Sequence, residues 1–163
     1  MMASTQTVIV ATDGSEVALR AASTGLSLLR STDTDRVIVV AVANTVDPSL
    51  AEDATGHAAA TMTHAQVEDQ HREMISWGES AVKETVAALR NSETPPADSW
   101  ETSVIEGDPG PALCQFATET KATAIIVGSR GLGRIKRAFL GSVSDYVVRN
   151  APCAVVVTRS SDS

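Results

Sequence analysis

Residues 36–43 read RVIVVAVA, a run that is apolar at every position after the arginine. A strand of this kind has both faces buried, which is typical of a parallel sheet covered by helices on both sides. Similar apolar runs stand at Thr7–Thr12 (TVIVAT), Ala122–Val127 (ATAIIV) and Ala154–Thr158 (AVVVT). Residues Trp100–Glu106 alternate between apolar and polar types and predict a weaker strand near a sheet edge. The sequence therefore predicts five strands.

Segments with helical spacing separate these strands. The helix expected over Ser15–Leu29 begins at a typical N-cap residue. The one expected over Asp108–Thr120 begins with an aspartate followed by a proline, which is a favourable start. Further helices are expected over 63–89 and 136–149. Strands that alternate with helices predict an α/β protein with one doubly wound, Rossmann-like sheet of five parallel strands and helices on both faces.

In a doubly wound sheet, ligands bind beyond the carboxyl ends of the strands, where the winding reverses. The loops after the strands are therefore the places to look for a site, and they are Asp13–Glu16, Ala43–Asp47, Gly107–Gly110 and Gly128–Ser142. The connection over residues 44–62 is rich in Ala and Thr, and we expect it to be long and partly mobile.

The chain has 163 residues, of which 43% are apolar and 3% aromatic, so one domain with an aliphatic core is expected. We assign this domain to residues 7–159, with a disordered start at 1–6 and a tail at 160–163. No apolar run approaches the roughly 18 residues that a membrane span needs. The polar N-terminus predicts no signal peptide, so we expect a cytoplasmic protein without membrane contact.

The net charge of −7 is unevenly distributed. Residues 1–119 carry 6 Lys and Arg against 18 Asp and Glu, whereas residues 120–163 carry 7 against 2. A chain that is acidic overall is a poor candidate for a nucleic-acid binder. The basic C-terminal segment instead favours a small anionic ligand, although chance clustering on a solvated surface is an alternative.

The most informative segment is Gly128–Ser142 (GSRGLGRIKRAFLGS), which comes after a predicted strand and leads into a predicted helix. Glycines let the backbone approach a ligand closely, and free amides at such a turn form an anion site that the helix dipole strengthens. Four basic side chains add positive charge without an intervening acid, namely Arg130, Arg134, Lys136 and Arg137. We interpret the segment as a phosphate-binding loop.

Two common phosphate loops do not fit this segment. The P-loop pattern GxxxxGK followed by Ser or Thr fails because Gly133 is followed by Arg134 and Ile135. The dinucleotide pattern GxGxxG fails because Lys136 stands where the third glycine belongs. The sequence therefore predicts neither a P-loop NTPase nor an NAD enzyme.

The spacing G-x2-G-x9-G-S within Gly128–Ser142 instead resembles the G-2x-G-9x-G-S/T signature of the universal stress protein family. Residues 11–15 (ATDGS), 107–109 (GDP) and 150–157 (NAPCAVVV) also resemble that family, in the same order along the chain. Each piece alone is weak, but together they extend the resemblance over residues 7–159.

The resemblance implies a sheet order of 3-2-1-4-5 and an ATP molecule between strands 1 and 4. It also implies a homodimer formed through the last strand, about residues 153–159. In this comparison Asp13 contacts the ribose, while the backbone at Val42 and around Ala11 faces the adenine. Gly128 lies by the ribose, and the phosphates are held by Gly131, Gly141, Ser142 and Val143. The full set of candidate nucleotide-binding residues is Ala11, Thr12, Asp13, Val42, Val127, Gly128, Arg130, Gly131, Gly133, Gly141, Ser142 and Val143. Mg²⁺ or Mn²⁺ is a candidate companion of the phosphates, with no side-chain ligand predicted.

The residues themselves leave alternatives open. A carboxylate at Asp13 can accept hydrogen bonds from a ribose diol, but it also suits a turn or a helix cap. Gly141 falls inside the helix expected over 136–149, where glycine costs about 1 kcal/mol relative to alanine. Close approach of a ligand explains such a glycine, and so does tight packing of the helix on the sheet.

The histidines and cysteines point to no metal centre. His57, His64 and His71 recur every seven residues, which on a helix places neighbours about 10.5 Å apart, too far for one ion to bridge. We interpret them as surface residues. Cys114 and Cys153 lie far apart in the sequence and are interpreted as small buried apolar residues.

No nucleophile–base pair and no metal cluster is evident in the sequence. We therefore predict an ATP-binding regulatory protein of the stress response that acts as a dimer without a catalytic constellation. One alternative is a slow ATPase or autokinase with Ser142 or Ser144 as phosphate acceptor. Others are a binder of AMP or cyclic AMP, and a dimerisation module with an empty pocket.

Overall fold

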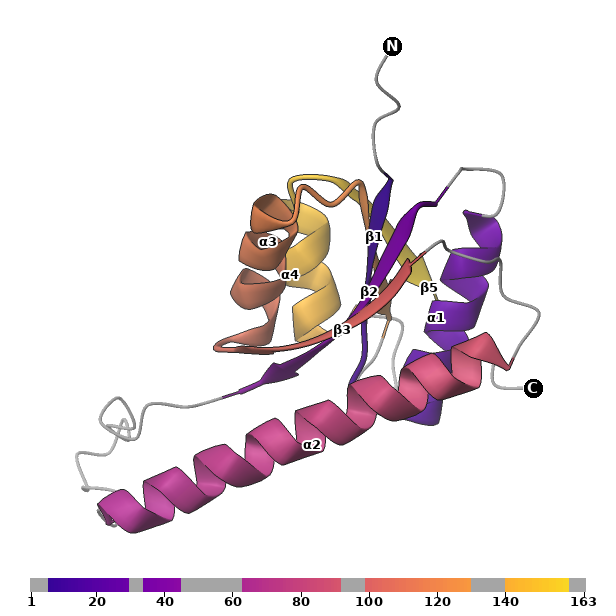
Figure 1. Cartoon of the computed structure of the whole chain (residues 1–163). Coiled ribbons are helices and arrows are strands. Elements are labelled where there is room, and N and C mark those ends of the chain that lie inside the picture. The colour runs from indigo at the N-terminus through magenta and orange to yellow at the C-terminus, as the bar shows by residue number, and fades with distance from the viewer. Residues whose placement is uncertain (1–5, 30–33, 45–62, 92–98, 130–139, 159–163) are drawn as a thin grey trace.

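The computed structural model describes residues 6–29, 34–44, 63–91, 99–129 and 140–158. Its elements in chain order are β1 (Thr7–Ala11), α1 (Glu16–Leu28), β2 (Arg36–Ala43), α2 (His64–Arg90), β3 (Ser99–Glu106), α3 (Pro109–Glu119), β4 (Ala124–Gly128), α4 (Ser142–Asn150) and β5 (Ala154–Thr158). In the described residues the strands form one sheet in the order β3-β2-β1-β4-β5, and every neighbouring pair is parallel (Figure 1). The predicted α/β class and sheet order are confirmed.

Helices cover both faces of the sheet (Figure 1). One core cluster lies between the sheet and the pair α1 and α2, and it includes Val10 and Leu89. The other lies between the sheet and the pair α3 and α4, and it includes Ile9, Leu113 and Val147. Successive residues of β1 thus enter opposite clusters. Burial on both faces is the physical reason for the unbroken apolar runs in the sequence.

The helices begin where the sequence provides suitable residues. Ser15 caps α1 as predicted, because its Oγ accepts a hydrogen bond from an amide of the first turn. Thr63 and Gln66 form a reciprocal capping box at the start of α2. Asp108 stands at the N-cap position of α3 and Pro109 comes next, but the Asp108 side chain makes no capping hydrogen bond in the described structure.

The last helix begins later than predicted. It starts at Ser142 rather than near residue 136, since Leu140 and Gly141 are not helical; residues 136–139 lie outside the described residues. The Gly141 amide donates to the Ser129 carbonyl at 2.8 Å, and its φ of −62° and ψ of 160° are extended. Gly141 is therefore the N-cap of α4, and the expectation of a mid-helix glycine is wrong.

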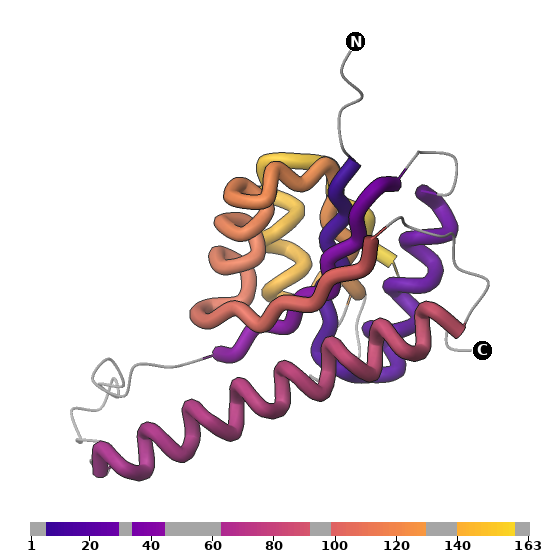
Figure 2. Tube along the Cα trace, viewed as in Figure 1, coloured from indigo at the N-terminus to yellow at the C-terminus, as the bar shows by residue number. Residues whose placement is uncertain are grey.

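α2 spans 27 residues and extends well past the sheet (Figure 2). Its buried residues lie in its second half and are Gly78, Ala81, Val82, Thr85 and Leu89. Gly78 allows a close approach to β3, because a Cβ there would come within 2.8 Å of Val104 Cγ1. The second half of α2 is therefore anchored on the sheet, while most of its first half is exposed.

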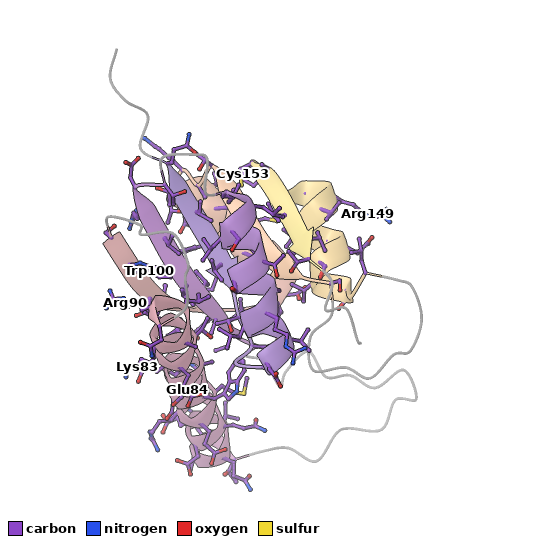
Figure 3. All side chains as sticks on the ribbon, turned by 90° about the vertical axis from the view of Figure 1, so that its right-hand side faces the viewer. Lys83, Glu84, Arg90, Trp100, Arg149 and Cys153 are labelled. Carbon is purple, nitrogen blue, oxygen red and sulfur yellow. The ribbon has the colours of Figure 1, made fainter. Side chains whose placement is uncertain are left out.

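The two cysteines are half-buried rather than fully buried, which corrects their interpretation from the sequence. Cys114 of α3 and Cys153, which Figure 3 labels just before β5, are free thiols that pack against the same core cluster. Burial raises the pKa of both thiols, and the charge of a Cys114 thiolate raises the pKa of Cys153 further. Cys153 stays partly exposed because it leads into the edge strand β5.

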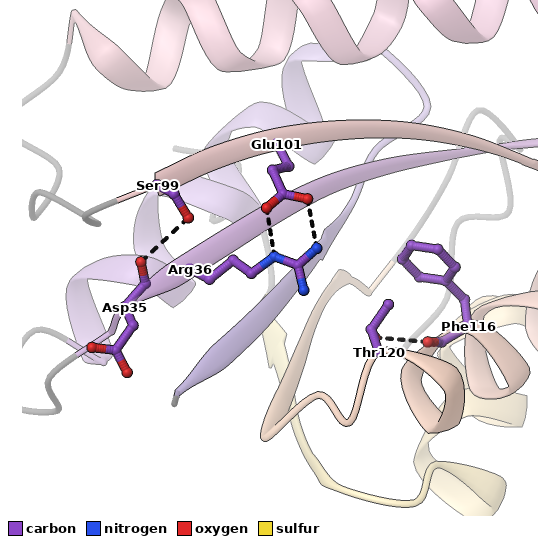
Figure 4. Close-up of polar contacts among 6 residues, drawn as sticks. All are labelled: Asp35, Arg36, Ser99, Glu101, Phe116 and Thr120. Atoms are coloured by element: carbon purple, nitrogen blue, oxygen red, sulfur yellow. Dashed lines mark hydrogen bonds and ion pairs between the residues drawn. The ribbon is translucent and has the colours of Figure 1, made fainter. Parts of the chain in front are cut away.

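A bidentate ion pair joins β2 to the edge strand β3. Arg36 Nε and Nη2 donate to the two carboxylate oxygens of Glu101, each at 2.6 Å (Figure 4). The same close-up shows Ser99 Oγ donating to the Asp35 carbonyl at 3.5 Å. The hydrogen bonds from Arg36 lower the pKa of Glu101, and the pKa of Arg36 is raised in return.

We predict that Arg36 and Glu101 contribute a coupling energy of about 0.5–1 kcal/mol to the free energy of unfolding at pH 7, as exposed but well-aligned pairs do. Because the pKa of Glu101 is lowered in the folded state, this contribution is present above the ordinary carboxyl pKa and disappears as the pH falls through the lowered value. A double-mutant cycle with Arg36→Gln and Glu101→Gln, followed by urea unfolding at several pH values, measures it. The more exposed Arg20–Glu16 pair of α1 is the control and should show less coupling. An equal coupling in both pairs would contradict the prediction.

Candidate functional site

The winding of the sheet reverses between β1 and β4. From β1 the chain passes to β2 and β3 on one side, and it then returns to β4 and β5 on the other. The register pairs Ile9 with Ile125 and Val10 with Ile126, so the carboxyl ends of β1 and β4 lie side by side. Ligands bind at this point in doubly wound sheets. The candidate site is therefore built from the turn after β1 and the segment after β4.

The chain leaves β1 through a tight turn. The Thr12 amide still donates to the Val40 carbonyl of β2 at 2.9 Å, whereas Gly14 has a φ of +76°, which residues with side chains rarely adopt. Asp13 lies between them and is half-buried. Its Oδ1 accepts the Ser15 amide at 3.0 Å, an Asx turn that fixes the direction of the carboxylate.

The two ends of the glycine-rich segment are fastened to each other beyond β4. The Ser129 carbonyl accepts the Gly141 amide at 2.8 Å, and Ser144 Oγ donates to the Gly128 carbonyl at 2.6 Å. The Ser129 amide in turn donates to the Thr158 carbonyl of β5 at 2.8 Å. These bonds hold the N-terminus of α4 against the carboxyl end of β4.

The first turn of α4 is suited to binding an anion. The leading amides of a helix have no partner within the helix and carry the positive end of its dipole. Within the described chain, no side chain caps α4, so the amides of Ser142 and Val143 remain available to a ligand. A phosphate group is the typical ligand of such a helix end.

Most of the residues predicted from the sequence stand at this one edge of the sheet. Ala11 ends β1 and is followed by Thr12 and Asp13, and Val42 lies near the end of β2. Val127 and Gly128 end β4, Gly141 is the N-cap of α4, and Ser142 and Val143 are its first residues. The other three candidates, Arg130, Gly131 and Gly133, lie outside the described residues. The proposed contacts of each residue with a nucleotide stay predictions, but the fold does bring the described ones to the same place.

Three buried hydroxyl groups stand beside this edge, and reasoning from the sequence does not find two of them, Thr85 and Thr158. Thr85 of α2 is 4% exposed, and its hydroxyl contacts that of Thr12 at 2.9 Å. Ser144, a candidate phosphate acceptor in the sequence, is also 4% exposed and already donates to a carbonyl, so it is poorly placed for that role. Thr158 pairs in register with Gly128, and its buried Oγ1 has no hydrogen-bond partner in the described structure.

The described residues offer no group of three His, Cys, Asp or Glu side chains that could hold a metal ion. His64 and His71 are exposed, and His71 pairs with Glu106 at 2.9 Å; His57 lies outside the described residues. Among the helices of the described structure, none is long and apolar enough to cross a membrane.

Comparison with known proteins identifies the family. A model of the universal stress protein family matches residues 4–159. The chain belongs to the universal stress protein family. It is 29% identical over 156 residues to the universal stress protein MJ0531 of Methanocaldococcus jannaschii, a match that covers 93% of this chain and 81% of that relative. The resemblance seen in the glycine spacing is thus confirmed at the level of the family.

Solved structures of the family share the fold. Universal stress protein UspA from Lactobacillus plantarum matches with a TM-score of 0.73 at 20% identity, over 96% of this chain and 99% of that one. A universal stress protein in complex with cyclic AMP matches with a TM-score of 0.61 at 24% identity, over 98% and 100%. A family protein from Arabidopsis thaliana with AMP bound matches with a TM-score of 0.60 at 20% identity, over 94% and 91%.

We predict that Ser144→Ala lowers the free energy of unfolding by about 1–2 kcal/mol, because it leaves the partly buried Gly128 carbonyl without its hydroxyl donor. Ser142→Ala is the matched control; Ser142 is exposed, so the change there should stay within about 0.5 kcal/mol. Urea unfolding of the nucleotide-free proteins measures both values. Equal effects of the two substitutions would show that the Ser144 hydroxyl does not hold the end of β4.

Proposed function

We propose that this universal stress protein binds ATP at the carboxyl ends of β1 and β4 and acts as a dimeric regulator in the stress response. The observation that carries the proposal is the uncapped N-terminus of α4, which the hydrogen bond between Gly141 and Ser129 holds beside the carboxyl end of β4. A helix end in this position binds phosphate groups through its amides. The adjacent strand β1 supplies the turn with Asp13 for the nucleoside part of the same ligand.

Asp13 is proposed to bind the ribose. Its Oδ1 accepts the Ser15 amide, and among the described residues none donates to Oδ2, which is proposed as the acceptor for a ribose hydroxyl. Charge-assisted hydrogen bonds of this kind contribute roughly 1.5–3 kcal/mol each. The backbone at Ala11 and Val42 is proposed to face the adenine, and the phosphates are assigned to the amides of Ser142 and Val143.

An adenine nucleotide is favoured as the ligand because two structures of the same fold are of complexes with cyclic AMP and with AMP. Among adenine nucleotides, ATP is favoured by the positive charge of the glycine-rich segment. The glycine-rich segment carries four basic residues within eight positions, 130–137, which suits three phosphates better than one. Mg²⁺ or Mn²⁺ is proposed to bind to the phosphates as a counter-ion, without a side-chain ligand.

The dimer is proposed to form through β5, at about residues 153–159. β5 is an edge strand, and its three consecutive valines, Val155–Val157, are only half-buried in the single chain. A cytoplasmic location is proposed because Cys114 and Cys153 are free thiols, as is usual in a reducing compartment.

We predict that ATP with Mg²⁺ raises the melting temperature of the protein, by roughly 5–10 °C when ATP is present at about 100 times its Kd. Bound nucleotide should first be removed by unfolding and refolding, with the supernatant checked for adenine absorbance. Titrations with AMP and cyclic AMP run in parallel. Tighter binding of AMP or cyclic AMP than of ATP would correct the nucleotide, and no binding of any of the three would refute the proposed function.

We predict that Asp13→Asn weakens ATP binding about 10- to 100-fold, because asparagine keeps an oxygen for the Ser15 amide but loses the negative charge that strengthens the ribose contact. Asp35→Asn is the matched control. Asp35 is also a half-buried aspartate that accepts a backbone amide, that of Gln6 at 2.7 Å, but it precedes β2 at the opposite end of the sheet. Isothermal titration calorimetry compares the two variants. An unchanged Kd for Asp13→Asn, or an equal loss in both, would contradict the ribose assignment.

A further inference from the structure

Thr85 is a buried polar residue on a helix whose exposed face is charged. Its neighbours Lys83 and Glu84 are exposed and are labelled on α2 in Figure 3. Thr85 itself is 4% exposed and contacts Thr12, the residue after β1. Its hydroxyl lies 2.9 Å from the hydroxyl of Thr12, which is 7% exposed. Buried hydroxyl groups need partners, and these two supply one to each other.

The Thr12 hydroxyl has a second contact that reaches into the turn after β1. It accepts the Gly14 amide at 3.1 Å, so Thr85, Thr12 and Gly14 form one short chain of hydrogen bonds. Because a hydroxyl can donate one proton and accept two bonds, Thr12 can hold both neighbours at once. The residue enclosed by this chain is Asp13.

α2 contacts the same turn at a second point, one helical turn away. A Cβ at Gly14 would come within 3.1 Å of the Ala81 side chain, so the backbone of the turn lies directly on the helix. Ala81 and Thr85 are both buried, and each faces one of the two residues that flank Asp13. The position of Asp13 is therefore set by the contacts of α2 with Thr12 and Gly14, in addition to the hydrogen bond from the Ser15 amide.

We propose that Thr85 is a positioning residue for the nucleotide site: through Thr12 it fixes the turn that carries Asp13, and it thereby links α2 to nucleotide binding. The role in nucleotide binding rests on the proposed function. The link acts in both directions, because a coupling between two places in a protein is reciprocal. A displacement of α2 changes the affinity for the nucleotide, and bound nucleotide steadies the second half of α2.

The test uses two substitutions at one position. Thr85→Val keeps the shape and the burial of the side chain but removes the hydroxyl, and Thr85→Ser keeps the hydroxyl. Thr7→Val is the matched control, since Thr7 is a threonine of the same 4% exposure at the other end of β1. Thermal unfolding of all variants establishes that each is folded before binding is measured.

Two readouts separate positioning from simple packing. In the nucleotide-free protein, hydrogen exchange of the Gly14 and Ser15 amides should become at least 5-fold faster in Thr85→Val and stay near the wild-type rate in Thr85→Ser and Thr7→Val. The Kd for ATP should rise about 5- to 10-fold in Thr85→Val and return to within 2-fold of wild type in Thr85→Ser. Both results together establish the role.

Other outcomes overturn it. Faster exchange with an unchanged Kd would mean that the site does not depend on the turn, and an unchanged exchange rate would mean that Thr85 does not hold it. A loss of affinity that Thr85→Ser fails to restore would assign the effect to packing. If the wild-type protein binds no adenine nucleotide, the proposed function fails and with it the role in binding, while the exchange rates still show whether Thr85 fixes the turn.

Discussion

The structure depends on the central strand β1, which is paired on both edges and buried on both faces. Its residues Ile9 and Val10 have no exposed surface, and it is bonded to β2 on one side and β4 on the other. A strand held in this way cannot shift by one residue, because every side chain would exchange one core cluster for the other. The polar side chains of β1 and its flanking residues are therefore found at its two ends. That is why Thr12 and Asp13 collect at the carboxyl end of the sheet.

The ends of β1 and β4 are fastened by hydroxyl groups that come from opposite faces. Thr85 of α2 holds Thr12 from one face, and Ser144 of α4 holds the Gly128 carbonyl from the other. Each such bond contributes only about 1 kcal/mol net, but a buried group left without its partner costs roughly 1–3 kcal/mol. These hydrogen bonds thus add little to the total stability. Any other arrangement of the two strand ends is disfavoured, because it would leave the bonded groups without partners.

Most of the fold could be predicted because its signals are local. The strand over Arg36–Ala43 agrees with the prediction residue for residue, since burial on both faces demands an unbroken apolar run. Ser15 is predictable as an N-cap for the same reason, because capping acts over a few residues. The sequence places the start of α4 too early, since that start is set by the bond between Gly141 and Ser129, two residues near opposite ends of the glycine-rich segment.

The site is predictable to the extent that its residues come directly after strands or belong to the spaced glycine motif. Asp13, Gly128 and Gly141 can be found in this way. Thr85 cannot, because its partner Thr12 is 73 residues away and a single threonine on a long helix carries no pattern. The sequence of α2 does not show which residues of its second half contact the turn after β1. Only the folded arrangement of α2 against β1 selects Thr85.

The two fastenings use different kinds of contact. α4 is tied to the end of β4 by a backbone bond and a side-chain bond, which together fix both its position and its direction. α2 meets the turn after β1 through one pair of neutral hydroxyls and through the contact of Ala81 with Gly14, both between small groups. The rest of the second half of α2 is anchored on the sheet through buried residues such as Val82 and Leu89. Under the proposed function, a nucleotide that bridges β1 and β4 is therefore linked to α4 by a backbone bond on one face and to α2 by a pair of hydroxyls on the other. Since most of the first half of α2 is exposed, a change at Thr85 acts on a helix whose other end a partner can reach.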